Sequence, residues 1–134
     1  MHDNKFELMK YRLDMSKEQL KSSEILLEAG NYKDSISRSY YSMFTATRAL
    51  LALECIDFSK HTGVISYFQK EYIKTGLIDK KYSKYLSQAF QIRNNSDYAD
   101  FFIVSKKDAQ EQSEKAKEFH SAIEEYINSK SSEP

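Results

Sequence analysis

The sequence contains very few of the residues that end helices or form tight turns. Its 134 residues include 3 glycines and 1 proline, and that proline, Pro134, is the last residue. Proline inside a helix removes a backbone hydrogen bond, and glycine is the residue that most often follows a helix end. The glycines are Gly30, Gly63 and Gly76. So few breakers favour a small number of long helices and nearly exclude an all-β fold.

Cysteine is equally scarce, which limits both disulfides and metal sites. Cys55 is the only cysteine, so no disulfide can form within the chain. No group of cysteine and histidine residues has the spacing of a zinc site. We therefore expect a reducing compartment and neither a metal nor a cofactor.

Long hydrophobic runs are missing as well. The longest apolar run, 49–53, is far too short for a bilayer, which needs about 20 residues. Charged residues alternate at the start of the chain, at Asp3, Lys5, Glu7 and Lys10, and this fits neither a signal peptide nor a transit peptide. The prediction is a cytoplasmic protein without a membrane partner.

The net charge of zero hides an uneven distribution. Residues 59–107 carry nine Lys and Arg against four Asp and Glu, a net charge of +5, whereas residues 108–134 carry three against seven, a net charge of −4. A basic centre favours an anionic partner such as RNA or a nucleotide. A solvated basic face, balanced by an acidic last helix, predicts the same counts, and both interpretations stay open.

Apolar residues recur at helical spacing along most of the chain and predict an all-α fold, an antiparallel bundle of about five helices. The first helix ends at Gly30-Asn31, the second runs from about Tyr32 to Leu53, the third from an N-cap at Ser59 to Gly76, the fourth from a cap at Asp79 to about 93–96, and the last from a capping box at 105–108 to about 127. We expect one domain over residues 1–128 and a disordered tail over 129–134.

The second helix is apolar on more than one side and should be the central one. Its apolar positions include Ile36, Tyr40, Met43, Phe44 and Leu50. Two long neighbours and two short ones should not cover so many apolar sides. This argument predicts a homodimer.

Four segments, taken in order and spacing, resemble the HEPN proteins of prokaryotes. They are SRSYYSMF at 37–44 followed by RALL at 48–51, HTGVISYF at 61–68, KTGLID at 74–79 and RNNSDYADF at 93–101. The resemblance covers about residues 17–127 and is strongest to the short single-domain kind encoded beside a minimal nucleotidyltransferase. It implies a helical domain that usually dimerises through the faces carrying these motifs, and that in many members cleaves RNA without metal.

The chain departs from the family's active-site signature, which is an Arg followed after four to six residues by a His. Here Arg93 is followed, after four intervening residues, by Tyr98, and Thr45 stands where relatives often have a His in the second helix. Both departures weaken the interpretation as a metal-independent endoribonuclease.

Metal-free cleavage through the 2′-hydroxyl needs a base, an acid and a cation that stabilises the phosphorane. Arg93 can supply the cation. His61 is the interior histidine available as the base, although a lone histidine at a helix start is also typical of capping or packing. Tyr98 is a poor base because an unperturbed tyrosine has a pKa of about 10. The catalytic candidates are therefore Arg93, His61 and Tyr98.

Four further residues are candidates for binding: Arg38, Tyr41, Asn94 and Asp97. Arg38 and Arg48 lie ten residues apart on the second helix and do not share one face, and we favour Arg38 for the site. At least one of the two is expected to form an ion pair, with Glu24, Glu28 or Glu54. Tyr41 can stack on a base or pack in the core or a dimer contact. Asp97 can orient Arg93, and Asn94 belongs to a polar segment where we expect a functional loop.

The resemblance leads to two main hypotheses. The first is the HEPN subunit of a toxin–antitoxin-type pair, a ribonuclease restrained by a nucleotidyltransferase encoded nearby. In related systems that enzyme adds a nucleotide to a tyrosine near the motif, and Tyr98 most resembles such a target. The second is a non-catalytic module that docks on the nucleotidyltransferase and helps bind its nucleotide or substrate. A homodimeric scaffold without a ligand is a third interpretation.

Overall fold

The computed structural model describes residues 4–131, and this part of the chain is helical with no strand. The elements are α1 (Asn4–Glu28), α2 (Tyr32–Ala52), α3 (His61–Phe68), a short π-helical segment η1 (Gln69–Ile73), α4 (Lys81–Tyr98) and α5 (Lys106–Ser131). The predicted all-α fold with five α-helices is confirmed. No helix within these residues combines the length and apolar character needed to cross a bilayer.

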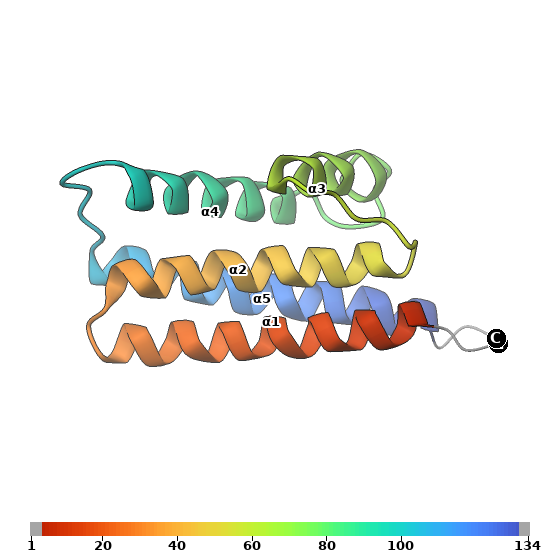
Figure 1. Ribbon diagram of the computed structural model, residues 1–134, viewed down its shortest axis with the longest axis horizontal. Coiled ribbons are helices and arrows are strands. Elements are labelled where there is room, and N and C mark those ends of the chain that lie inside the picture. The colour runs from red at the N-terminus through yellow and green to blue at the C-terminus, as the bar shows by residue number, and fades with distance from the viewer. Residues whose placement is uncertain (1–3, 132–134) are drawn as a thin grey trace.

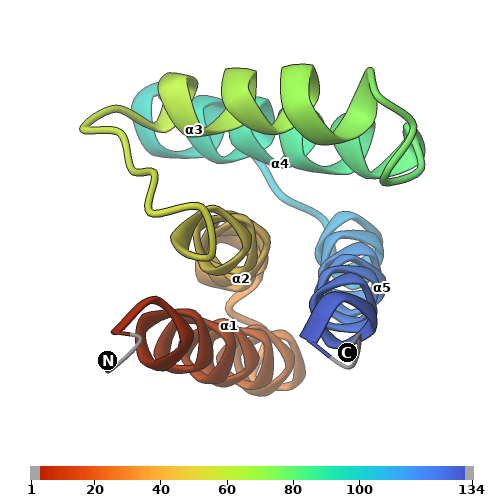
Figure 2. The same cartoon turned by 90° about the vertical axis from the view of Figure 1, so that its right-hand side faces the viewer.

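The helices form two layers around α2, as Figures 1 and 2 show. The long helices α1, α2 and α5 lie side by side with roughly parallel axes, and α1 runs antiparallel to α2. The second layer contains α3, η1 and α4, and it covers the side of α2 that faces away from α1. The end-on view in Figure 2 shows α2 surrounded by α1, α5 and this layer.

The core is built on α2, which is buried along nearly its whole length. Met43 and Leu51 are fully buried within a single chain, and Leu50 is 1% exposed. Small buried residues on α2 let α1 approach closely, and the Oγ of Ser16 donates a 2.7 Å hydrogen bond to the carbonyl oxygen of Ser42. The argument that a second copy must cover α2 is therefore wrong, because α1, α5 and the second layer do so. The homodimer itself stays a prediction.

Two helix ends follow the local sequence as expected. Gly30 has a φ of 82°, a conformation in which a residue with a Cβ is strained, and the amide of Asn31 donates to the carbonyl oxygen of Leu26 at 2.9 Å. At the start of α5 the Oγ of Ser105 accepts from the amide of Asp108 at 3.0 Å, and the carboxylate of Asp108 accepts from the amide of Ser105 at 3.2 Å. The predicted helix stop and capping box are both confirmed.

Other predicted boundaries are wrong. The N-cap of α3 is Lys60, without a side-chain cap, so Ser59 does not cap the helix. The fourth helix does not end at 93–96 but continues to Tyr98, and the expected functional loop is helical. Ser96 is only 1% exposed, so packing outweighs the tendency of short polar side chains to leave the helix.

The end of the chain also differs from the expectation. Helix α5 extends to Ser131, so residues 129–131, which the sequence assigned to a disordered tail, are helical. Residues 132–134 of that tail lie outside the described part of the chain.

Candidate functional site

His61, the first residue of α3, is held against one face of α2 by aromatic side chains. Its Nδ1 lies 2.8 Å from the Oη of Tyr40, within hydrogen-bond distance. Its ring stacks on Phe44 with a centroid separation of 4.1 Å and meets the ring of Tyr41 edge-on at 5.9 Å. Three neighbouring α2 side chains thus fix the position and orientation of one half-buried imidazole.

Arg93 reaches the same face of α2 from α4. Its guanidinium lies over the ring of Tyr41, 5.1 Å from the centroid, and its Nε lies 2.8 Å from a carboxylate oxygen of Asp97. The Nε–H is not aligned with that oxygen, so the contact is an ion pair rather than a hydrogen bond. The side chain of Arg93 is 19% exposed. Arg93 is therefore anchored between a ring and a carboxylate beside His61.

The electrostatics of the cluster keep His61 neutral. Burial lowers the pKa of His61, and the positive charges of Arg93 and Arg48 lower it further. Burial raises the pKa of Tyr40, as does the neighbouring Tyr41, so the phenol keeps its proton. When the imidazole proton is on Nδ1, the ring donates to Tyr40 and Nε2 is left as a proton acceptor.

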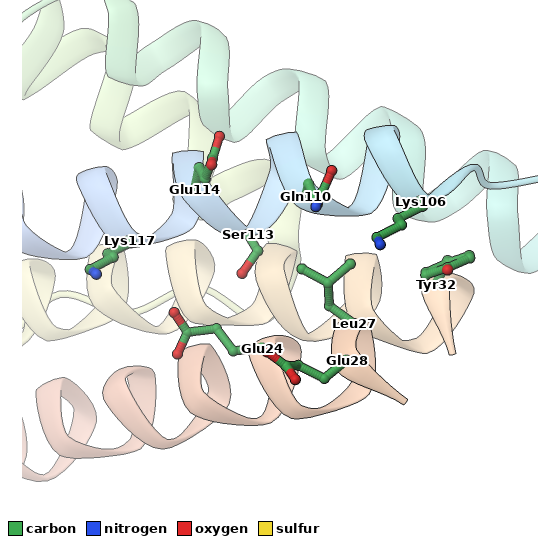
Figure 3. A pocket seen from close by; sticks show the side chains of 9 residues that line it. All are labelled: Glu24, Leu27, Glu28, Tyr32, Lys106, Gln110, Ser113, Glu114 and Lys117. Atoms are coloured by element: carbon green, nitrogen blue, oxygen red, sulfur yellow. The ribbon is translucent and has the colours of Figure 1, made fainter. Parts of the chain in front are cut away.

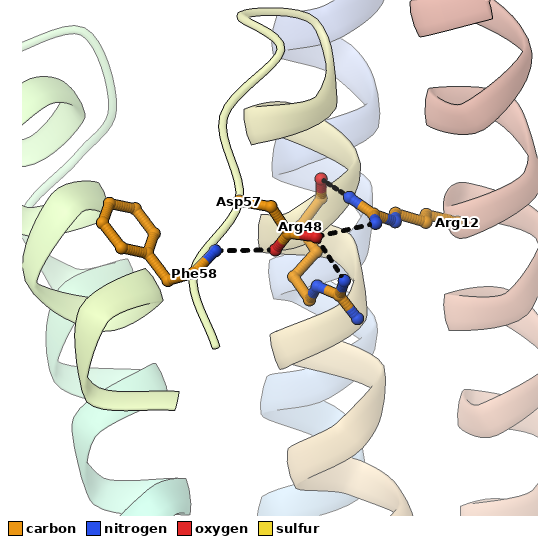
Figure 4. A network of polar contacts seen from close by, with 4 residues as sticks. All are labelled: Arg12, Arg48, Asp57 and Phe58. Atoms are coloured by element: carbon orange, nitrogen blue, oxygen red, sulfur yellow. Dashed lines mark hydrogen bonds and ion pairs between the residues drawn. The ribbon is translucent and has the colours of Figure 1, made fainter. Parts of the chain in front are cut away.

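Arg48, one turn beyond Phe44 on α2, belongs to a separate network shown in Figure 4. Its Nη2 lies 2.7 Å from Asp57, and the Nη2 of Arg12 lies 3.2 Å from the same carboxylate oxygen. Arg12 also donates to the carbonyl oxygen of Arg48 at 3.1 Å. The network ties α1, α2 and the connection after α2 together. The sequence predicted an ion pair with Glu24, Glu28 or Glu54. For Arg48 this prediction is wrong, because its ion-pair partner is Asp57.

The structure brings together four of the seven residues selected from the sequence: Tyr41, His61, Arg93 and Asp97. Arg38 is exposed on α2 and forms no hydrogen bond or ion pair within residues 4–131. Asn94 is half-buried on α4 and forms no hydrogen bond with the four. Tyr98, at the end of α4, is 79% exposed. The grouped residues therefore come from α2, α3 and α4, and Tyr98 stands at their edge in solvent.

Tyr40 and Phe44 are not among the site residues predicted from the sequence, which placed both among the apolar positions of the second helix. With Arg48 they recur every four residues, and this spacing places them on one face of α2. The spacing alone indicates a shared face. It does not indicate that His61, from another helix, lies against that face.

A pocket with a volume of about 680 Å³ lies elsewhere, between α1 and α5. Figure 3 shows Glu24 and Glu28 of α1 on one side and Lys106 and Lys117 of α5 on the other. Opposite charges face each other there, so the pocket favours neither anions nor cations. Within residues 4–131 no group of three or more His, Cys, Asp or Glu is arranged to hold a metal ion.

Comparison with known proteins agrees with this bundle. The family model for the HEPN domain matches residues 9–126, and the chain belongs to the HEPN domain family. A UPF0332 protein of Thermotoga maritima is 30% identical over 93% of this chain and 95% of its own length. A protein of Methanocaldococcus jannaschii named "Putative toxin" is 34% identical over 88% of this chain and 80% of its own length.

A UPF0332 protein of Pyrococcus horikoshii has higher identity over a shorter region. It is 47% identical over 77 residues, which are 58% of this chain and 54% of the relative. The chain thus spans about half the length of that relative.

Proposed function

We propose that this protein is the HEPN subunit of a toxin–antitoxin-type pair, an endoribonuclease that needs no metal ion and is restrained by a nucleotidyltransferase encoded nearby. One observation carries the proposal. A cation, Arg93, and a neutral imidazole, His61, contact the same ring, that of Tyr41. The name of the Methanocaldococcus jannaschii relative supports the toxin part.

The cluster suits cleavage through the 2′-hydroxyl of RNA. His61 accepts the proton of that hydroxyl, the 2′-oxygen attacks the adjacent phosphorus, and the bond from phosphorus to the 5′-oxygen breaks. The departing oxygen takes its proton from water. Arg93 donates hydrogen bonds to the phosphate oxygens and stabilises the charge that develops on them. His61 thereby supplies the base that the family's signature places after the Arg, where this chain has Tyr98.

The exposed Tyr98 suits the regulatory part of the proposal. Its side chain is 79% exposed at the end of α4, one residue after Asp97, which pairs with Arg93. A nucleotidyltransferase can reach its hydroxyl without unfolding the bundle. A nucleotide attached there would place a negatively charged phosphate near Arg93 and compete with RNA.

A second candidate is a non-catalytic module that docks on the nucleotidyltransferase and helps bind its nucleotide or substrate. The pairing of Arg93 with Asp97 favours it, because a carboxylate already neutralises the cation that the reaction needs. In that case Tyr41 would stack on a base of the bound nucleotide or substrate without cutting RNA.

Cleavage of single-stranded RNA in the presence of a chelator separates the two candidates. For a ribonuclease, Arg93→Ala lowers the cleavage rate by roughly two to four powers of ten. The control is Arg38→Ala, which removes an exposed arginine of α2 that contacts none of the cluster, and its rate should stay near that of the wild type. A wild-type protein that leaves RNA intact while binding the nucleotidyltransferase tightly supports the second candidate.

The homodimer is part of the proposal. Exposed apolar side chains on one face of α1 support a protein contact there: Leu8, Tyr11, Met15 and Ile25, which are 37–62% exposed. Light scattering at micromolar concentration should give twice the mass of the chain. A monomeric mass that persists at high concentration contradicts the dimer.

A further inference from the structure

The second layer carries a shallow groove between η1 and the start of α4. It has a volume of about 470 Å³ and is lined by Ser66, Gln69, Lys70, Ile73, Lys74 and Ser83. Two lining side chains carry a positive charge, three are neutral and polar, and none is a carboxylate. We infer that this groove binds the phosphate groups of single-stranded RNA, at a place separate from the cluster around His61.

The π-helical segment brings the two lysines to the same side. The amide of Lys74 donates to the carbonyl oxygen of Gln69 at 2.9 Å, a bond between residues five apart. A turn of this kind holds more residues than an α-helical turn, so side chains four apart lie closer to one line. Ser66, Lys70 and Lys74 follow each other at intervals of four. Their polar groups therefore face the groove together.

The charges of these lysines are not neutralised by the protein. Lys70 and Lys74 are exposed and form no ion pair within residues 4–131. By contrast, the Nζ of Lys81 lies 2.6 Å from Glu118. Glu71, the acidic residue nearest in sequence, acts electrostatically on Tyr67 and does not line the groove. The groove therefore presents net positive charge to an anion.

Ser83 adds an oriented hydroxyl on the α4 side. The side-chain Nε2 of Gln69 donates to the Oγ of Ser83 at 3.0 Å and to the Oγ of Ser87 at 3.1 Å. Since each oxygen accepts this bond, its own proton is available for another acceptor. Ser83 lines the groove and Ser87 does not. A phosphate oxygen in the groove can accept from Ser83 as well as from the lysines.

The groove lies within reach of a strand bound at the candidate site. Lys70 follows His61 by nine residues along one helical stretch, and a rise of about 1.5 Å per residue separates them by roughly 14 Å. Nine residues are about two and a half α-helical turns, so RNA with one phosphate at Arg93 has to cross over α3 to enter the groove. The inference rests on the proposed function for RNA as the ligand, while the groove itself is independent of cleavage.

The test measures binding with an oligonucleotide that cannot be cut, a single-stranded 2′-O-methyl RNA, in chelator and at several salt concentrations. Each phosphate contact on a single strand contributes about 0.7 to the slope of log affinity against log salt. Lys70→Ala/Lys74→Ala should lower the slope by about 1.4 and the affinity about tenfold. The control, Lys10→Ala/Lys21→Ala, removes the same charge from exposed positions of α1 and should change affinity less than about twofold.

A second pair of variants tests the hydroxyl. Ser83→Ala should weaken binding about fivefold, the loss of one hydrogen bond to a phosphate at an exposed site. Ser87→Ala removes the other partner of Gln69 and should leave affinity unchanged. Circular dichroism confirms that each variant is folded.

Three results would overturn the inference. The first is equal weakening by the groove and α1 double variants, which means that only net charge matters. The second is unchanged binding in the double variant Lys70→Ala/Lys74→Ala. The third is competition by adenosine monophosphate as strong as that by the oligonucleotide, which means a mononucleotide site. Because the probe cannot be cleaved, a protein without ribonuclease activity still gives a clear result.

Discussion

The Oη of Tyr40 and the Nδ1 of His61 lie 2.8 Å apart, and this hydrogen bond connects the middle of α2 to the first residue of α3. Tyr40 is completely buried, whereas His61 is half-buried at the edge of the cluster. The buried phenol therefore holds the Nδ1 side of the imidazole in the core, and the rest of the ring lies toward solvent. The pKa of Tyr40 is raised and the pKa of His61 is lowered, so the two groups titrate in well-separated pH ranges. The hydrogen bond therefore persists over the wide range between them.

The first prediction concerns this bond. Tyr40→Phe leaves the Nδ1 of His61 without its partner, and the free energy of unfolding should fall by about 1 kcal/mol. The pH profile of RNA cleavage should be lower at every pH too, because the imidazole of His61 is no longer held in place by Tyr40. Urea denaturation and the cleavage profile measure the two effects. Tyr41→Phe removes a hydroxyl that has no hydrogen bond within residues 4–131 and serves as the control. Equal effects of both variants would contradict the prediction.

The second prediction concerns the charge of Arg93. Its positive charge lowers the pKa of His61, in addition to burial. Arg93→Gln should therefore raise the pKa of His61, and an NMR titration of the imidazole carbons measures the change. Arg38→Gln, on the exposed face of α2, should leave the pKa of His61 in place. An unchanged value in Arg93→Gln would show that Arg93 is farther from His61 than the structure places it.

The third prediction is a loss of stability in mild acid. Burial lowers the pKa of His120, whose Nδ1 lies 2.8 Å from the Oγ of Ser16 in the core. The unfolded chain, with an ordinary histidine pKa of about 6.5, then binds more protons than the folded chain. Stability is complete above that value and is lost as the pH falls below it toward the folded-state pKa. His61 contributes in the same direction.

Urea denaturation at pH 7.5 and at pH 5.0 measures this dependence. His120→Gln should have a lower free energy of unfolding at the higher pH and a smaller difference between the two conditions. If the wild type is equally stable at both pH values, the lowered pKa values of the two histidines are wrong.

The fourth prediction compares two serines near helix starts. Ser105→Ala removes the cap of α5 and should lower the free energy of unfolding by about 1 kcal/mol. Ser59→Ala should have almost no effect, because α3 begins at His61 and Ser59 makes no capping bond. Thermal or urea denaturation of the two variants decides this. A larger loss in Ser59→Ala would contradict the helix start seen in the structure.

Part of the site was predictable from the sequence and part was not. The sequence predicted that Asp97 orients Arg93, and the ion pair agrees with this, but the one-turn spacing of the two side chains on one helix came from the structure, because the sequence ended that helix at 93–96. The contact of Arg93 with Tyr41 crosses between α4 and α2, and the bond of His61 to Tyr40 crosses between α3 and α2. Such contacts depend on how far one helix is shifted and rotated against another, which periodicity does not contain.

The sequence by itself determined the all-helical class, the stop at Gly30 and the cap at Ser105, because helix spacing and capping act over a few neighbouring residues. Tertiary structure decided that α4 continues past Arg93, since burial of Ser96 in the packed layer outweighs its local preference. It also decided that Asp57 pairs with Arg48 and that His61 lies on Tyr40. These contacts join residues on different elements, and only the packing of the helices brings them within reach.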